Sequence, residues 1–286
     1  MWNRLGVLTD EVSVQLTEAL DWIKEQQLAH VEIRMVDGHN IISLSDEQVQ
    51  RVQEEVSKRG LFISAIASPV FKCALDPSRP VASGDTFGQK EESVEAHFDK
   101  LQRSFEICKL LGTKQIRIFS FWREVSPQQH EQEIVGHLRT AAEMAQKQDI
   151  VLLLENEPSC NGGFASEVAR LTQLVASPNL KVLWDPGNEE YGGRNSYPAG
   201  YKDVQASLGH VHLKDALIDS DGVSRCVPIG SGNVPFKEQL QALQADGYTG
   251  LFTIETHYVP AGGTAKDGTA LTLEGLKTII KEAGLD

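Results

Sequence analysis

The chain has 286 residues with a formal net charge of −13, and 41% of its residues are hydrophobic while 23% are charged. This composition is typical of a globular protein with a sizeable apolar core, and about 250 residues are usual for one eight-unit α/β barrel. The negative charge and the lack of a dense lysine or arginine run exclude nucleic acid as a favoured partner, because polyanion binding depends on basic residues that displace counterions.

The beginning of the chain, MWNRLGVLTDEVS, lacks the apolar stretch and the cleavage site of a secretory signal. No apolar run reaches the roughly 18 residues that a membrane span needs, so we expect a cytoplasmic protein without a membrane partner. The cysteines lie far apart and lack CxxC spacing, which favours reduced, buried thiols over disulfides or a zinc knuckle. They are Cys73, Cys108, Cys160 and Cys226.

Short apolar runs rich in β-formers alternate with amphipathic stretches along the whole chain, as expected for repeated βα units around a parallel sheet. The predicted strands are residues 4–9, 30–35, 61–67, 115–120, 150–155, 181–185, 210–214 and 251–255. The predicted helices are residues 14–27, 46–58, 91–111, 128–148, 164–175, 201–208, 235–245 and 270–283. Eight such pairs without an intervening linker predict an α/β fold, a (β/α)8 TIM barrel that forms a single domain over residues 1–286.

Local signals support several of these boundaries. Ser45 precedes an acidic first turn, as a helix N-cap does. Gly60, Gly112 and Gly247 stand where helices are expected to end. Two connections, residues 68–90 and 216–234, are longer than usual and each follows a strand, so in a barrel both belong to the carboxyl face. We expect them to cover an active site, with a plain surface insertion as the alternative.

The last four predicted strands each carry one metal-ligating side chain at or near the carboxyl end. These residues are Glu155, Asp185, His212 and Glu255. In a closed parallel barrel such ends converge on one mouth. Three carboxylates and one imidazole suit Mn2+, Mg2+, Co2+ or Zn2+ and leave coordination positions for a substrate. The alternative is that each acid caps a helix or forms an ion pair.

Four motifs carry a resemblance to a known family. LLLENEP, LWDPGN, HVHLKD and TIETH occur in this order around the four candidate ligands. Together they resemble the xylose-isomerase-like TIM-barrel superfamily, particularly its sugar phosphate isomerase/epimerase branch, which includes ketose 3-epimerases. The resemblance covers nearly the whole chain. It implies a metal-dependent isomerase or epimerase of carbohydrate metabolism, and because members often form dimers or tetramers it is compatible with such a homo-oligomer.

The resemblance also implies roles for individual residues. Glu155 and Glu255 would be paired catalytic carboxylates that pass a proton through a metal-stabilised enediolate, and Asp185 would be a ligand only. Arg225 looks like the arginine with which the epimerases bind substrate oxygens. Asn188 stands where ketose 3-epimerases have a histidine, and an amide does not titrate near neutral pH. A different sugar, or a different step, therefore stays open.

Further side chains near the predicted strand ends have two interpretations each. Trp122 could stack on a sugar or simply pack, and Lys214 could reach the substrate or neutralise the acidic mouth. Of the two histidines in HVHLKD, His210 could replace His212 as the ligand. Glu32 and Arg34 share a face of their strand, so we expect them to pair with each other.

Other functions remain as alternatives on the same scaffold. A dehydratase of a cyclic polyol or a sugar-like ketone would need the same metal site. An apurinic endonuclease of the superfamily would need additional histidines on the earlier strands and at the Asn188 position, and neither that position nor the carboxyl ends of those strands carry one. Its polyanionic substrate also conflicts with the net charge of −13. A non-catalytic sugar-binding barrel would have no need for paired carboxylate bases.

Overall fold

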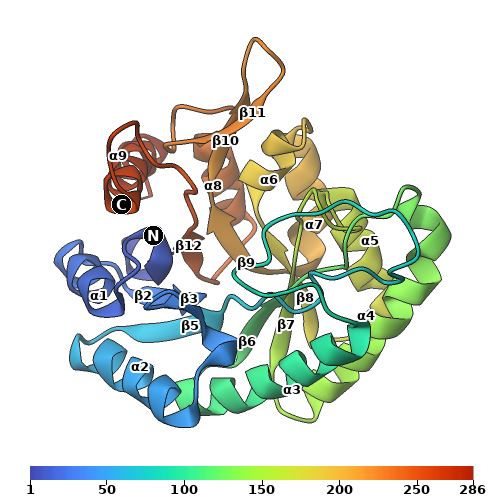
Figure 1. Cartoon of the computed structure of the whole chain (residues 1–286). Helices are drawn as coiled ribbons and strands as arrows, with labels where there is room; N and C mark the ends of the chain where they lie inside the picture. The colour runs from blue at the N-terminus through green and yellow to red at the C-terminus, as the bar shows by residue number, and fades with distance from the viewer. Residues whose placement is uncertain (286) are drawn as a thin grey trace.

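A computed structural model of the chain describes residues 1–285 and contains a closed barrel of eight parallel strands (Figure 1). Around the barrel the strands follow the order β1 (Leu5–Leu8), β12 (Phe252–Ile254), β9 (Leu208–Leu213), β8 (Leu180–Trp184), β7 (Val151–Glu155), β6 (Gln115–Ile118), β5 (Phe62–Ile66) and β2 (His30–Ile33). All eight predicted strands are present, and the predicted TIM barrel is confirmed.

The larger helices surround the strands. They are α1 (Leu16–Glu25), α2 (Asp46–Lys58), α3 (Val94–Leu111), α4 (Glu131–Gln146), α5 (Ala165–Val175), α8 (Phe236–Ala245) and α9 (Ala265–Ala283). The predicted segment 201–208 is a short helix, α7 (Tyr201–Val204), followed by a 3-10 turn. Helix α6 (Pro186–Tyr191) was not predicted, and helix α9 begins five residues before the predicted start because Thr264 caps it in a capping box with Asp267.

The predicted helix ends follow the expected chemistry. Ser45 accepts a hydrogen bond from Gln48 N and forms a capping box at the start of α2. Gly60, Gly112 and Gly247 have φ angles of 74°, 73° and 73°, in the left-handed region that favours glycine. The sequence therefore specifies where these helices end.

The two faces of the strands have different surroundings. On β7, Leu152 and Leu154 point outwards into the large core shared with the helices. Leu153 points inwards and packs with Ala65 and Leu183 in a small cluster inside the barrel. Because side chains alternate along a strand, Glu155 also points inwards, one layer closer to the carboxyl end. The inward face thus changes from apolar to charged towards one mouth.

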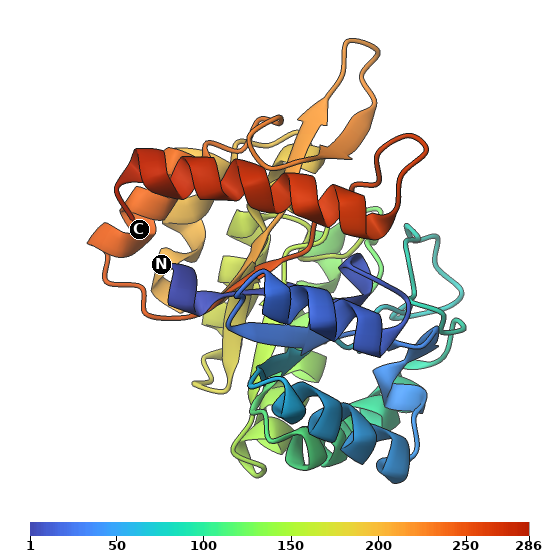
Figure 2. The same ribbon diagram turned by 90° about the vertical axis from the view of Figure 1, so that its left-hand side faces the viewer.

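Two hairpins extend the carboxyl side of the barrel. One joins β3 (Met35–Val36) to β4 (His39–Asn40), and the other joins β10 (Asp215–Ile218) to β11 (Ser224–Val227). The β10–β11 hairpin projects from the body of the molecule (Figure 2). The Asp215 carboxylate accepts backbone hydrogen bonds from Gly230, Gly232 and Val234 at 2.9–3.1 Å and so fixes the connection behind the hairpin.

The chain ends close to where it starts, because the Met1 ammonium donates a hydrogen bond of 3.1 Å to the Leu285 carbonyl. Both views show the termini near each other (Figures 1 and 2). Within residues 1–285, no helix combines the length and the apolar character needed to cross a membrane.

Candidate metal centre at the barrel mouth

Four side chains from neighbouring strands meet at the carboxyl mouth of the barrel. Glu155 ends β7, Asp185 follows β8, His212 lies in β9 and Glu255 follows β12. One ligand atom from each lies within 4.8 Å of the others, and all four residues are buried. The structure thus brings together the four residues that the sequence predicted as ligands, and we refer to them as the four-residue cluster.

Two oxygens of the cluster lack hydrogen bonds. Glu155 Oε2 and Asp185 Oδ2 are buried and accept none from the residues that the structure describes. Their nearest cations form ion pairs without hydrogen-bond geometry: Arg117 Nη1 lies 3.3 Å from Glu155 Oε2, and Lys214 Nζ lies 2.7 Å from Asp185 Oδ2. An unsatisfied buried carboxylate oxygen is costly. A divalent cation coordinated by these oxygens would remove that cost, so the donor set fits a metal.

Glu255 has a different environment. Its Oε1 accepts hydrogen bonds from Arg34 Nη1 at 2.7 Å and from Arg117 Nη1 at 3.0 Å. Its Oε2 lies 3.0 Å from His212 Nδ1. Burial raises the pKa of Glu255, but the positive charges of His212, Lys214 and His257 outweigh this effect and hold it well below its usual value. Glu255 is therefore a fully paired carboxylate.

The expected pair between Glu32 and Arg34 does not form. Arg34 binds Asp10 and Glu11, with Nε 2.8 Å from Asp10 Oδ2 and Nη2 2.8 Å from Glu11 Oε1. Strand β2 ends at Ile33, so Arg34 has already left the strand and extends over the mouth. Glu32 stays inside the barrel, and its two oxygens contact two histidine rings.

Those rings belong to the two histidines of β9. Glu32 Oε1 lies 2.5 Å from His210 Nε2, and Glu32 Oε2 lies 3.0 Å from His212 Nε2. His210 also contacts Thr253 Oγ1 at 2.9 Å, so it belongs to a deeper group and not to the four-residue cluster. Burial lowers the pKa of His212, but the carboxylates of Glu32 and Glu255 outweigh burial and raise it well above its usual value.

Asn188 lies in the first turn of α6, next to the cluster. Its Nδ2 donates to the Asn156 carbonyl at 2.8 Å and to Glu155 Oε1 at 3.4 Å, and its backbone N donates to Asp185 Oδ1 at 3.0 Å. Asn156 in turn accepts from Asp185 N at 2.8 Å. Asn188 therefore contacts both carboxylates through amide groups, in addition to the ion pairs that Lys214 and Arg117 form with them.

A cavity of about 330 Å³ adjoins the cluster. Its lining includes Lys214 and Asn188, which contact the cluster, and both predicted long connections contribute to its walls. The connection after β5 supplies Lys72, Asp85 and Phe87, and strand β11 supplies Cys226; the remaining lining residues are Glu157, Tyr191 and His257. Both connections therefore contribute to the walls of this cavity, and that they cover an active site stays a prediction.

Two predicted substrate-binding residues lie outside this lining. Arg225, on β11, has a side chain 59% exposed and pairs with Asp219 at 2.7 Å. Trp122 is buried against Phe87 and Phe119, and its indole N–H donates to Glu91 Oε2 at 2.8 Å. In this structure neither side chain faces the cluster.

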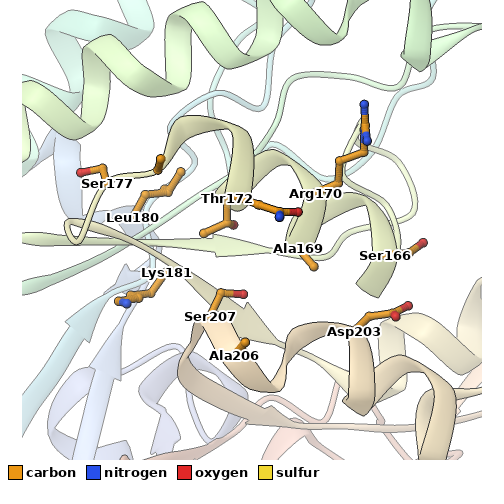
Figure 3. Close-up of a pocket in the computed structure, with 12 residues that line it drawn as sticks. Ser166, Ala169, Arg170, Thr172, Ser177, Leu180, Lys181, Asp203, Ala206 and Ser207 are labelled. Atoms are coloured by element: carbon orange, nitrogen blue, oxygen red, sulfur yellow. The ribbon is translucent and has the colours of Figure 1, made fainter.

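A second hollow, a groove of about 580 Å³, lies on the outside of the barrel between α5 and the α7 region. Figure 3 shows its lining, including Arg170, Lys181 and Asp203, spread along the groove without converging on one point. None of these residues belongs to a group with metal-ligand geometry among residues 1–285. The chemistry of this fold is therefore concentrated at the mouth.

Sequence reasoning missed several residues of the mouth. Arg117 is completely buried and contacts both glutamates of the cluster. The sequence could have indicated this role for Arg117, because a charged residue in the middle of the apolar strand QIRIFS needs a counter-charge inside the barrel. Asp10, Glu11 and Lys72 lie shortly after strands, but no motif distinguishes them from ordinary loop residues.

The chain is a closed parallel barrel in which three carboxylates and one histidine gather at the carboxyl mouth. Comparison with family models makes this specific: residues 20–281 match the family of xylose isomerase-like TIM barrels, and the chain belongs to that family.

Similar proteins show the breadth of that family. The chain is 23% identical over 278 residues to the L-ribulose-5-phosphate 3-epimerase UlaE of Escherichia coli, covering 92% of each chain. Among solved structures it resembles IOLI protein with a bound zinc atom (TM-score 0.74, 15% identity, 98% and 99% of the two chains covered). It also resembles the probable 3-DHS dehydratase AsbF of Bacillus anthracis (TM-score 0.72, 19% identity, 96% and 98% covered). At these identities the structural likeness shows the shared fold alone.

Proposed function

We propose that the chain is a divalent-metal-dependent isomerase or epimerase of a sugar or sugar phosphate, with Glu155, Asp185, His212 and Glu255 as the metal ligands. The observation that carries the proposal is the convergence of these four side chains within 4.8 Å at the barrel mouth, beside a cavity. The epimerase activity of the relative UlaE and the zinc atom bound in IOLI support it.

A bound divalent metal would act as a Lewis acid that makes the hydrogen next to a substrate carbonyl more acidic. The protein's own groups would then move the proton. Glu155 is the better candidate for the base, because within residues 1–285 its carboxylate accepts only the 3.4 Å hydrogen bond from Asn188, so one oxygen could bind the metal while the other approaches a C–H group. Glu255 would first have to take up a proton, which it would then return from the opposite side, and exchange of both glutamates with solvent would restore the starting state. Return to the same carbon gives epimerisation, and return to its neighbour gives isomerisation.

The cavity residues would orient the substrate. Asn188 has an amide within reach of Glu155 and of the cavity, so it can hydrogen-bond a substrate hydroxyl without titrating. Lys214 lines the same cavity while paired with Asp185. Arg225 and Trp122 would need the hairpin or the aromatic cluster to rearrange before they touched a substrate, so Asn188 and Lys214 are the stronger candidates.

The decisive experiment measures deuterium uptake from heavy water into a panel of ketoses and ketose phosphates. The protein is loaded in turn with Mn2+, Mg2+, Co2+ and Zn2+, and bound metal is quantified. We expect one substrate class to exchange a carbon-bound hydrogen only when metal is bound. Consumption of a substrate with loss of water would assign the dehydratase alternative. Stoichiometric metal without any turnover would leave only a sugar-binding barrel.

A further inference from the structure

Lys72 is a buried cation of the mouth to which the proposed function gives no role. It lies in the connection between β5 and α3, and only 3% of it is exposed. The nearest anionic atom, Glu157 Oε2, is 3.7 Å away. The Lys72 ammonium donates no hydrogen bond to any side chain or carbonyl of residues 1–285. Lys72 Nζ is not one of the fully enclosed atoms without a partner, so it opens onto the cavity. An ammonium in so buried a side chain still carries a desolvation cost, which an oxygen ligand in the cavity would reduce.

The surroundings of Lys72 offset part of this cost. Its Nζ lies 4.4 Å from the ring centre of Phe87, 4.5 Å from that of Phe119 and 5.8 Å from that of Trp122. Aromatic faces attract a cation but do not occupy its N–H donors. The ammonium is therefore held in place while its hydrogen-bonding capacity stays available.

The backbone next to Lys72 also fixes its position. Phe71 has a φ of 66°, a left-handed conformation that is strained for a bulky residue. Phe71 N donates a 2.8 Å hydrogen bond to His97 Nδ1. Burial lowers the pKa of His97 to about 4, so its ring is neutral and can accept this bond. The backbone conformation of Phe71 thus holds the neighbouring Lys72 at the cavity.

Lys72 and Glu157 line the same cavity as Asn188 and Lys214. Asn188 contacts Glu155, and Lys214 contacts Asp185, so the cavity runs from the four-residue cluster to the Lys72–Glu157 pair. A small molecule held at the cluster would extend towards this pair.

The charges around the cavity decide what kind of molecule fits. Two ammonium groups, Lys72 and Lys214, face two carboxylates, Asp85 and Glu157, and Lys214 is already paired with Asp185. A phosphate would bring between one and two further negative charges to this lining. A hydroxyl group, in contrast, can accept a hydrogen bond from Lys72 and donate one to Glu157.

We propose that Lys72 and Glu157 form a specificity-determining pair that binds hydroxyl groups of an uncharged polyhydroxylated ketone. The substrate is then a free sugar or a cyclic polyol ketone and not a sugar phosphate. This inference rests on the proposed function, since it takes the cluster as the place where the reacting end of the substrate is held.

Calorimetric binding to the Mn2+-loaded protein tests the inference without requiring turnover. The probes are the ketoses L-ribulose and D-fructose, each compared with its own monophosphate. We expect at least one uncharged probe to bind more tightly than its phosphate. Lys72→Met should weaken that binding about 10- to 100-fold, as for loss of hydrogen bonds to a charged group, and Glu157→Gln should weaken it several-fold. Lys181→Met, in the outer groove of Figure 3, is the matched control and should leave affinity unchanged.

Tighter binding of the phosphates, with a loss of that preference in Lys72→Met, would overturn the inference and assign a phosphate site. Unchanged affinity in a folded Lys72→Met protein, or no binding of any uncharged probe, would overturn it as well. If Lys72→Met does not fold, Lys72→Gln and Glu157→Gln give the same readout.

The two proposals can fail separately. Binding that depends on Lys72 but occurs without deuterium exchange would refute the proposed reaction and support the binding pair. Deuterium exchange with ketose phosphates alone would support the reaction and refute the pair.

Discussion

The two sides of the barrel mouth hold their carboxylates by different means. On the β7–β8 side, Asn188 donates amide hydrogen bonds to Glu155 and Asp185. Each of these carboxylates keeps one oxygen without a hydrogen bond from residues 1–285, although Arg117 and Lys214 form ion pairs with those oxygens. On the β12–β2 side, Glu255 is hydrogen-bonded to the guanidinium groups of two arginines, Arg34 and Arg117. The carboxylates of the first side thus keep oxygens without hydrogen bonds, whereas both oxygens of the carboxylate on the second side are hydrogen-bonded.

The same contrast appears in two buried glutamates that are not members of the cluster. Burial raises the pKa of Glu11, but the charges of His257 and Arg34 outweigh it and lower the pKa to about 2. Burial raises the pKa of Glu189 to about 7, because the backbone N–H of Ala165 and the charge of Arg194 offset it only in part. Burial of a carboxylate therefore has opposite consequences, depending on whether a close cation is present.

The comparison is tested most strongly by Glu155→Gln. If Glu155 is the base, the deuterium-exchange rate should fall about 100- to 10,000-fold. The stability of the metal-free protein should change little, because the substitution breaks no strong hydrogen bond. Exchange kinetics, bound metal and urea unfolding of the same preparation check the three parts. An exchange rate within tenfold of the wild type at equal metal content would remove Glu155 from the base role.

Glu255→Gln should lower the stability of the metal-free protein much more than Glu155→Gln does. Removing this charge leaves Arg34 and Arg117 without their shared counter-ion, and breaking a buried pair typically costs about 3–5 kcal/mol. We expect the metal-free variant to lose stability on this scale in urea unfolding. Equal stabilities of Glu155→Gln and Glu255→Gln would show that the two sides do not differ as described.

The raised pKa of Glu189, which lies next to Asn188 in α6, predicts that the stability of the protein depends on pH. The pKa of Glu189 in the folded protein, about 7, lies above the ordinary 4.5, so the folded state binds the proton more tightly. The stabilisation is complete below pH 4.5 and is lost as the pH rises through 7, by about 3 kcal/mol in total. Urea unfolding of wild type and Glu189→Gln between about pH 4 and pH 8 measures the difference. Parallel pH profiles of the two proteins would contradict the assignment.

The smallest expected effect is that of the metal on stability. Metal at about 100 times its dissociation constant should stabilise the folded protein by about 2.7 kcal/mol, and a chelator should reverse this. The stabilisation should disappear in Asp185→Asn and persist in Asp203→Asn, whose side chain lies in the outer groove. Thermal melting with and without Mn2+ gives the readout, and stabilisation of both variants alike would place the metal elsewhere.

The sequence predicts the fold well because its determinants are local. Alternating strands and helices, the Ser45 cap and the helix-ending glycines are each set by a few neighbouring residues. Helix α6 was not predicted because it is one short element, opened by Pro186 directly after Asp185. A helix of six residues is too short to show a helical period in its apolar residues, so only its tertiary contacts reveal it.

The site could be predicted only in part. The four predicted ligands lie at or near the carboxyl ends of neighbouring barrel strands, so the sequence predicts that they meet. The partners of Arg34 could not be deduced from the sequence. They depend on where β2 ends and on the position of Asp10 and Glu11 in the turn after β1. The same holds for Lys72, whose surroundings depend on aromatic rings from distant parts of the chain.

The residues of the cluster and many of the residues that line the cavity belong to different parts of the fold, which matters for redesigning this protein. The cluster residues lie on or directly after strands, whereas Lys72, Asp85 and Phe87 come from the connection after β5. If both proposals hold, the cation is bound by residues on or directly after strands, whereas Lys72 of the specificity pair lies in a loop and its partner Glu157 follows β7. Exchanging residues 68–93 for the equivalent stretch of a relative should then change the ligand preference and leave the four-residue cluster unchanged.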